Sequence, residues 1–458
     1  MSLAFLLEVP EFKDLVRALR GPAAGGEAPP SISGLAGAAK PFFCAALAHA
    51  LDRPIVFIQP VERSSGRLEE EIRFFLSGLG SSRRIGALPD LTETPFAETA
   101  PSLEAVSSRM RFFYDLLYQP PALIVTTAFG LTRPLPPPER LPSLFLRVAK
   151  GSFHDRDEIL ERLAAFGYVR EDLISFRGEY AGRGGIVDVY SPWQNAPYRI
   201  EFGGDEILSL REFDPSTQRS IRRLESVLIP SLLEVSPGEE AGRRGVPFTD
   251  YQEEAVFIVD GPGAVDAEWD EALADCAARG IEPDGAIARS WGELRSRAAR
   301  VEELETGESE GPHFHFPFQS VPRFDNRIPF FLDYLRRAER ERDRTYIYFS
   351  GDAVRRKVAS LLEQHGIPAR PAASALGSPT AGEALLVLGA LDRGFSFPRE
   401  KIAFFAEGDI ITEEKVVVSR PSVRPSLTQF QDLKIGDHIV HADYGIGVFQ
   451  GLLKMEVD

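Results

Sequence analysis

Short apolar runs separated by turn residues dominate the stretch 178–220. Gly-Arg-Gly-Gly, Ser-Pro and Gly-Gly-Asp lie between these runs, and this alternation predicts an antiparallel β-meander. Arg183, Arg199 and Arg211 fall at strand starts or on the polar phase of the strands, so we expect their guanidinium groups along one solvent face. A face of this kind suits a protein partner rather than a core. The apolar runs are 186–189, 200–202 and 207–210.

The beginning of the chain alternates strand-like and helix-like segments. Residues 55–58 and 123–126 are short apolar runs, whereas residues 68–79 and 103–117 carry apolar positions at helical spacing. Alternation of strand and helix predicts a parallel sheet. The same kind of alternation between residues 323 and 411 predicts a separate small α/β domain, to which we assign no chemistry.

Composition limits the class of partner. The chain has 458 residues, with 52 Lys and Arg against 68 Asp and Glu, so its formal net charge is −16 and any DNA contact would need a local basic patch. Protein partners are therefore favoured. Cys44 and Cys276 are the only cysteines, which excludes a zinc site built from cysteine pairs and fits a reducing cytoplasm. No run of eighteen apolar residues occurs, so we expect a soluble protein without membrane contact.

A degenerate phosphate-binding loop is predicted before an apolar helix, within residues 33–47. A working loop reads G-x-x-x-x-G-K-[ST], in which glycine lets backbone amides close around phosphate and a hydroxyl helps to hold Mg²⁺. Ala39 replaces the second glycine, and Pro41 replaces the hydroxyl and removes an amide donor. We therefore expect no working nucleotide site, and the plain alternative is a helix start with Lys40 in solvent. The loop positions are Gly34, Gly37, Ala39, Lys40 and Pro41.

A second remnant of a nucleotide-hydrolysing fold ends the buried strand 255–260. In such a fold the strand ends in Asp-Glu, where the Asp holds Mg²⁺ through water and the Glu polarises the attacking water. Here Asp260 is followed by Gly261. We expect the carboxylate to cap the helix that begins after Gly263 instead.

His313 and His315 alternate with aromatic residues in PHFHFPF, as in a strand. Two histidines could ligate a metal, but no third ligand lies nearby in the sequence. A structural role, and no metal site, is therefore expected for both.

Three segments of the meander, RGGIVDVY, YRIEFGGDEI and LREFDPSTQRS, resemble the second domain of a family that contains the excision-repair protein UvrB and the transcription-repair coupling factors (Mfd). In that family this small β-rich domain binds UvrA, the damage-recognition ATPase. The resemblance places Arg183, Arg199, Phe202 and Gly203 on the UvrA-binding surface. Gly203 stands where some relatives have an apolar ring. A decayed phosphate loop is likewise a feature of the coupling-factor branch.

The stretch GDHIVHADYGIGVFQGL, within residues 433–458, resembles the RNA-polymerase-interacting domain that coupling factors share with CarD-type regulators. In the family this domain is a small five-stranded, Tudor-like β-barrel. Strand, turn and strand are predicted here, so the chain is expected to end inside the barrel. Met455 matches a position that the family uses against the polymerase β subunit, although a core-facing role in the second strand is an equal alternative.

We therefore expect an α/β multidomain protein that corresponds to the N-terminal portion of a coupling factor. A UvrB-like module, built on a degenerate P-loop-type parallel sheet with an inserted β-rich domain, precedes a second α/β domain. The expected bounds are 1–143 for domain 1A, 144–232 for the inserted domain 2, 233–322 for domain 1B, 323–411 for the small α/β domain, 412–432 for a linker and 433–458 for the start of the polymerase-interacting domain.

The resemblance implies transcription-coupled nucleotide excision repair, in which the full-length protein displaces stalled RNA polymerase by ATP-driven translocation on DNA. Its helicase-like motor, with ATP and Mg²⁺, is expected beyond residue 458. This portion should then bind UvrA without a cofactor or enzymatic activity, and DNA contact should come mainly through the motor. Two alternatives stay open. A divergent UvrB-like enzyme would bind nucleotide and damaged DNA through Lys40 and Asp260, and a CarD-like regulator would carry an unusual N-terminal extension.

Overall fold

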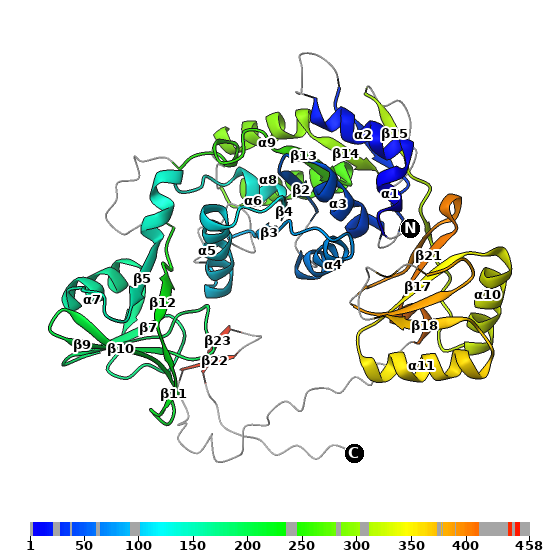
Figure 1. The fold of residues 1–458 in the computed structure, drawn as a ribbon. Coiled ribbons are helices and arrows are strands. Elements are labelled where there is room, and N and C mark those ends of the chain that lie inside the picture. The colour runs from blue at the N-terminus through cyan, green and yellow to red at the C-terminus, as the bar shows by residue number, and fades with distance from the viewer. Residues whose placement is uncertain are drawn as a thin grey trace. The chain divides into compact units, whose positions relative to one another are not determined.

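The computed structural model contains two compact units, residues 1–411 and residues 412–458 (Figure 1). In the second unit, β22 (His438–His441) pairs antiparallel with β23 (Gly445–Val448), which agrees with the prediction of two strands in this segment. Among the described helices, none combines the length and the apolar composition that crossing a membrane requires. The structure describes residues 3–21, 28–36, 39–60, 65–91, 101–234, 245–280, 285–302, 311–372, 377, 379–389, 391–411, 438–441 and 445–448.

A seven-stranded sheet, sheet A, carries the core of the first domain, and every strand pair in it is parallel. The strand order is β15-β1-β14-β13-β2-β4-β3. Its central strands β2 and β13 are continuously apolar, as strands covered on both faces must be. The predicted parallel sheet is therefore confirmed. Its strands are β1 (Ser31–Ser33), β2 (Ile55–Ile58), β3 (Ile85–Leu88), β4 (Leu123–Thr126), β13 (Val256–Asp260), β14 (Ala299–Glu302) and β15 (His313–His315).

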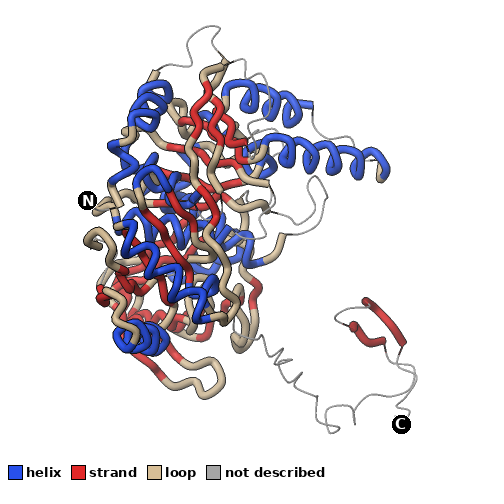
Figure 2. The backbone as a smooth tube through the Cα atoms, turned by 90° about the vertical axis from the view of Figure 1, so that its right-hand side faces the viewer, coloured by secondary structure: helices blue, strands red, loops and turns tan. Residues whose placement is uncertain are grey.

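Helices cover both faces of sheet A (Figures 1 and 2). Ile55 and Phe57 of β2 pack against one set of helices, whereas Val56 and Ile58 pack against another, because successive strand residues point to opposite faces. The first set is α1 (Phe5–Glu8), α2 (Pro10–Arg20), α3 (Ala39–Ala50) and α4 (Ser65–Gly78). The second set is α5 (Leu103–Tyr118), α6 (Ala128–Thr132), α8 (Pro262–Ala278) and α9 (Gly285–Arg297).

A six-stranded sheet, sheet D, forms the β-rich domain, with strand order β11-β10-β9-β8-β7-β6. All its strand pairs are antiparallel except β6 with β7, which confirms the predicted meander. One face packs on α7 (Arg156–Ala165) through residues such as Val187 and Ile200. β5 (Phe145–Ala149) and β12 (Ser226–Pro230) form a separate antiparallel pair. The strands of sheet D are β6 (Val169–Arg170), β7 (Glu179–Arg183), β8 (Ile186–Val189), β9 (Tyr198–Gly203), β10 (Glu206–Phe213) and β11 (Ser220–Leu224).

A third sheet, sheet E, forms the small α/β domain in the order β16-β20-β21-β17-β19-β18. Helices α10 (Ile328–Glu341) and α11 (Asp352–Gln364) cover one of its faces around Ile347 and Phe349. A short helix, α12 (Glu407–Ile410), follows the last strand. The strands are β16 (Gln319–Ser320), β17 (Arg344–Phe349), β18 (Ala369–Ala372), β19 (Ala384–Leu388), β20 (Phe395–Phe397) and β21 (Ile402–Ala406).

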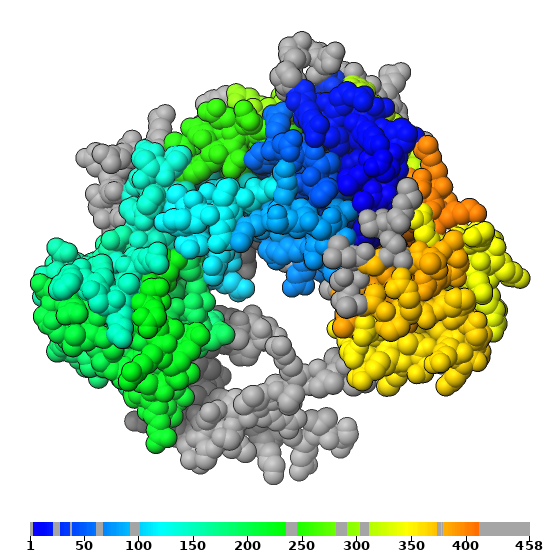
Figure 3. All heavy atoms as spheres, in the orientation of Figure 1, coloured from blue at the N-terminus to red at the C-terminus, as the bar shows by residue number. Residues whose placement is uncertain are grey.

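The other face of sheet E packs directly on the helices that cover sheet A, as the orange and blue residues of Figure 3 show. The Phe42 ring of α3 lies 5.7 Å from that of Phe395, and the Phe5 ring of α1 lies 5.7 Å from that of Phe397. Helices α1, α3 and α4 are thus shared by two sheets. The small α/β domain has its own sheet but shares a hydrophobic core with the first domain.

Candidate functional site

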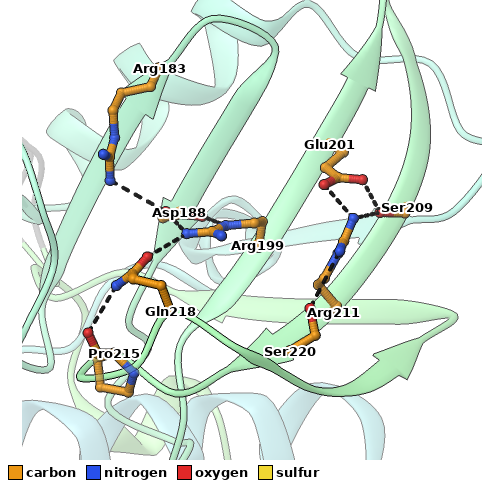
Figure 4. Close-up of polar contacts among 9 residues, drawn as sticks. All are labelled: Arg183, Asp188, Arg199, Glu201, Ser209, Arg211, Pro215, Gln218 and Ser220. Carbon is orange, nitrogen blue, oxygen red and sulfur yellow. Dashed lines mark hydrogen bonds and ion pairs between the residues drawn. The ribbon is translucent and has the colours of Figure 1, made fainter.

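A row of charged side chains crosses the face of sheet D that points away from its hydrophobic core. Asp188 on β8 lies opposite Arg199 on β9. Arg199 in turn lies opposite Arg211 on β10, and Arg211 lies opposite Arg223 on β11. Residues paired across antiparallel strands point to the same face, so these four side chains share one face with Arg183. Figure 4 shows Arg183, Asp188, Arg199 and Arg211. We call it the arginine face, and it agrees with the arrangement that the sequence predicts.

Arg199 is held inside this face rather than extended into solvent. Its Nε and Nη2 donate to the two carboxylate oxygens of Asp188 at 2.7 and 2.8 Å, and Nη2 also donates to Gln218 Oε1 at 2.8 Å. Its guanidinium carbon lies 4.3 Å from the centre of the Phe213 ring, and the side chain is 18 % exposed. The hydrogen bonds to Asp188 raise the pKa of Arg199, so this bidentate pair stays charged and rigid.

Arg183 is one of the two exposed arginines of the face, together with Arg223. It ends β7, its side chain is 55 % exposed, and its Nη2 lies 3.9 Å from Oδ2 of Asp188. The Asp188 carboxylate is almost completely buried, so one carboxylate sits between two guanidinium groups. A contact of 3.9 Å at an exposed arginine is weak, which leaves Arg183 able to turn towards a partner.

Arg211 forms a second internal ion pair on the face, with Glu201 (Figure 4). Ser209 Oγ donates to Glu201 at 2.6 Å, and Arg211 donates to Ser209 Oγ at 3.2 Å and to Ser220 Oγ at 3.3 Å. The hydrogen bond from Ser209, and after it the bond from Arg211, lowers the pKa of Glu201. Arg211 is therefore fixed in place, and less of its charge is available to a partner than that of Arg183.

Phe202 and Gly203, the other two predicted contact residues, lie on opposite faces of sheet D. Phe202 pairs with Ile207 and packs against the core of the domain, away from the arginines. Gly203 is exposed on the arginine face, and a Cβ placed on it would lie 2.7 Å from Cδ1 of Leu208. The side chain of Leu208 therefore occupies the space above Gly203.

The residues of this face that the sequence interpretation missed include Asp188, Gln218, Arg223 and Leu208. Asp188 had a signal, because it is an acidic residue inside the otherwise apolar strand IVDV. Leu208 had none, because its position depends on an irregular register between Ile207 and Ser209.

The degenerate phosphate loop and the strand-end acid meet in space. Lys40 Nζ, in the first turn of α3, lies 2.7 Å from Oδ1 of Asp260 at the end of β13. The two side chains are only 26 % and 14 % exposed. The lysine that would neutralise phosphate and the carboxylate that would hold Mg²⁺ thus neutralise each other, as a direct ion pair does.

This ion pair corrects two expectations. Lys40 does not point into solvent, because it is partly buried against Asp260. Asp260 does not cap α8, because the N-cap residue is Gly261, which has a left-handed backbone (φ 60°) and no side chain to cap with. The physical reason is that a partly buried carboxylate is strongly stabilised by a cation 2.7 Å away.

The structure also describes three further positions of the predicted loop, Gly34, Ala39 and Pro41. Gly34 has φ +80°, and a Cβ on it would lie 2.1 Å from the carbonyl oxygen of Phe316, so a close backbone approach requires this glycine. Ala39 is completely buried and Pro41 is buried within the first turn of α3. Gly37 lies outside the described residues, as does Met455.

His313 and His315 are bonded to serines of the neighbouring strand. The two ring nitrogens of His313 lie 2.8 Å from Ser31 Oγ and 3.0 Å from Ser33 Oγ, and Nδ1 of His315 lies 3.0 Å from Ser33 Oγ. These bonds join β15 to β1 and give both histidines a structural role. Within the described part of the chain, no cluster of three or more His, Cys, Asp or Glu side chains could hold a metal ion.

Comparison with known proteins supports the resemblance in two segments. The family described as the UvrB interaction domain matches residues 146–232, which include the whole arginine face. The family described as the CarD-like/TRCF RID domain matches residues 433–458.

Whole-chain comparison finds proteins named transcription-repair-coupling factor. The one from Myxococcus xanthus is 28 % identical over 93 % of this chain and 42 % of its own length. The one from Bacillus subtilis is 24 % identical over 99 % of this chain and 44 % of its own length. The one from Haemophilus influenzae is 32 % identical over 38 % of this chain and 15 % of its own length. The chain thus spans less than half the length of the relatives that it matches.

Proposed function

We propose that the chain corresponds to a portion of the transcription-repair-coupling factors and that this portion is a recruitment module that binds the excision-repair ATPase UvrA. One observation carries the proposal: the segment that matches the UvrB interaction domain, residues 146–232, is the segment that displays the arginine face. An exposed guanidinium beside two fixed ones suits carboxylates and carbonyls of a protein partner. In the complete protein, this recruitment would couple stalled transcription to excision repair.

Titration of purified UvrA against the 458-residue chain tests the proposal. Replacing Arg183 by alanine is expected to weaken binding by roughly 2 kcal/mol, the scale of an interface hot spot. Arg356 on α11, whose side chain is 75 % exposed, offers a matched control outside the face. Equal affinity of the wild type, Arg183→Ala and Arg356→Ala proteins would contradict the assignment, and so would the absence of any UvrA binding.

We further propose that this portion neither binds nor hydrolyses ATP. The Lys40–Asp260 ion pair supports this proposal, because a nucleotide would have to separate two charges that already neutralise each other. ATP, Mg²⁺ and translocation on DNA would then belong to parts of the complete protein other than these residues. The competing function, a divergent UvrB-like enzyme, predicts a saturable Mg²⁺-dependent ATP signal at micromolar nucleotide, which equilibrium binding with labelled ATP would detect.

RNA polymerase is the second proposed partner, through residues 433–458, and the match to the CarD-like/TRCF RID domain supports it. The described part of this segment is the two-stranded sheet of β22 and β23. Two strands alone are marginally stable in water, so we expect a tight polymerase contact to need further strands of the barrel. Comparing binding of the polymerase β subunit by this chain and by a chain extended with a relative's following residues would test this.

A further inference from the structure

Leu208 and Phe153 are two of six large apolar side chains that are exposed in the β-rich domain; the others are Val169, Leu173, Phe176 and Ile221. Leu208 is 51 % exposed and Phe153 is 74 % exposed. Single exposed apolar residues are ordinary, but two that lie on the same face beside exposed charges form the kind of patch that marks a contact site. The backbone brings both residues to the arginine face.

Backbone pairing places Phe153 on that face. Residues 151–154 run along the beginning of β10, which β11 does not reach, and there Ile207 N donates to Ser152 O at 2.9 Å and His154 N donates to Asp205 O at 2.8 Å. Phe153 is therefore paired with Glu206, and Glu206 is paired with Gly203. Paired residues point the same way, so Phe153 points to the side on which Gly203 and the arginines lie.

An irregularity in β10 brings Leu208 to the same side. Ile207 pairs with Phe202 and Ser209 pairs with Glu201, so Leu208 is an extra residue without a partner on β9. Such bulges redirect a side chain. The position above Gly203, 2.7 Å from where its Cβ would stand, is filled by Cδ1 of Leu208. The glycine thus makes room for a leucine that comes from the next strand.

We propose that Phe153 and Leu208 are the apolar anchor residues of the UvrA-binding face and that Arg183 is its charged contact residue. This inference rests on the proposed function and names residues through which it acts. Interfaces concentrate their affinity in a few apolar and arginine side chains at the centre of a polar surround. The complementary patch on UvrA should therefore hold an apolar depression bordered by carboxylates, with the depression facing Leu208.

The charges of the face favour an acidic protein surface over a second copy of this chain. Arg183 and Arg223 are exposed, while Arg199 and Arg211 already hold acidic partners on the face. Within the chain the formal net charge is −16, so arginines gathered on one face stand out from the rest of the protein. Self-association through this face would set its exposed arginines against each other, which is unfavourable.

The test measures UvrA affinity of the full chain with Leu208→Ser, Phe153→Ser and the double variant. Each single change is expected to weaken binding at least tenfold, and the double change at least fiftyfold. Phe330→Ser on α10 is the control, because Phe330 is 63 % exposed but lies in the small α/β domain, and it should change affinity less than twofold. All three sites are exposed, so the melting temperature should stay within a degree or two of wild type.

A transposition variant sharpens the test. Exchanging the two residues, as Gly203→Leu with Leu208→Gly, moves the apolar group from β10 to β9 at nearly the same place, and we expect it to recover binding to within about threefold of wild type. Gly203 has no left-handed backbone, so a leucine can stand there once Leu208 is removed.

The outcomes separate this inference from the function on which it rests. If Leu208→Ser and Phe153→Ser bind UvrA like wild type while Arg183→Ala binds weakly, the apolar anchors are wrong and the proposed function stands. If the wild-type chain does not bind UvrA, both fall. If the apolar variants change only self-association, seen by sedimentation without UvrA, a second copy covers the face and the inference is overturned.

Discussion

The carboxylate of Asp188 bonds both Nε and Nη2 of Arg199 and lies 3.9 Å from Arg183, so one buried acid orders two arginines of the same face. This arrangement divides their roles. Arg199, stacked on Phe213 and largely enclosed, is part of the structure of the sheet. Arg183 extends into solvent with its charge only loosely held, so it is the arginine that can exchange its contact for one with a partner.

Replacing Asp188 by asparagine is expected to destabilise the β-rich domain by about 1 to 3 kcal/mol. The change removes the negative charge that is paired with Arg199. The expected loss of stability is smaller than for a fully buried ion pair because Arg199 retains contact with solvent. Amide hydrogen exchange in β8 and β9 measures the loss without interference from the other sheets. Asp205→Asn, in the exposed turn between β9 and β10, is the control and should leave exchange unchanged.

The Lys40–Asp260 pair should behave as a coupled unit. Lys40→Met alone leaves a mostly buried carboxylate without its cation, and we expect a loss of about 1 to 3 kcal/mol in the free energy of unfolding. Combined with Asp260→Leu, the loss should largely disappear, because an apolar pair needs no compensation. A double-mutant cycle in urea measures the coupling. Strictly additive effects would mean that Lys40 and Asp260 contribute no coupling free energy to the stability of the fold.

Stability of the β-rich domain should fall in acid partly because of Glu201. Bonds from Ser209 and Arg211 lower the pKa of Glu201 below its ordinary value of 4.5. The unfolded chain therefore binds a proton more readily, so this contribution is present above pH 4.5 and is lost as the pH falls through the lowered pKa. Ser209→Ala removes the hydrogen bond that contributes most to the lowered pKa of Glu201, so it should flatten this part of the dependence of stability on pH. Hydrogen exchange in β9 and β10, measured as a function of pH, would show this. An unchanged profile would show that Glu201 titrates alike in both states.

Local patterns in the sequence predict much of this fold. The meander follows from apolar runs with turn residues between them, and the parallel sheet follows from alternation of strands and helices. The predicted helix 103–117 also agrees with α5 to within a residue. These features depend on residues that are close together in the chain, so a single sequence is enough to predict them.

Contacts between distant residues account for most of what was missed. Lys40 and Asp260 are 220 positions apart, and their ion pair exists only because the first turn of α3 meets the carboxyl end of β13. The Asp188–Arg199 pair needs the register between β8 and β9, and the place of Leu208 needs a one-residue irregularity within β10. Neither the strand order of a parallel sheet nor a bulge leaves a reliable mark in a single sequence.

Docking of the small α/β domain should depend on Gly389. A Cβ on this residue would lie 2.3 Å from Cε2 of Phe74, whose ring is held edge-on against Tyr348 at 5.0 Å. Gly389→Val therefore forces apart α4 and sheet E, and we expect a loss of about 1 to 3 kcal/mol by overpacking. Faster hydrogen exchange in β17 and β19 would report it. Gly351→Ala is the control, because nothing lies within 4 Å of its Cβ position.

Conservative replacements should separate the two arginines most clearly. Arg183→Lys keeps an exposed positive charge, so UvrA affinity should fall only about threefold and stability should not change, since its bond to Asp188 is long. Arg199→Lys keeps the charge but cannot make the bidentate bond to Asp188 or stack as a plane on Phe213. We expect it to lower the free energy of unfolding by about 1 to 2 kcal/mol and to weaken UvrA binding as well, because Asp188 would then draw Arg183 towards itself. Titration with UvrA and urea unfolding of both variants decide the matter. If Arg199→Lys weakens binding while stability is unchanged, Arg199 contacts the partner directly and the division of roles argued from Asp188 is wrong.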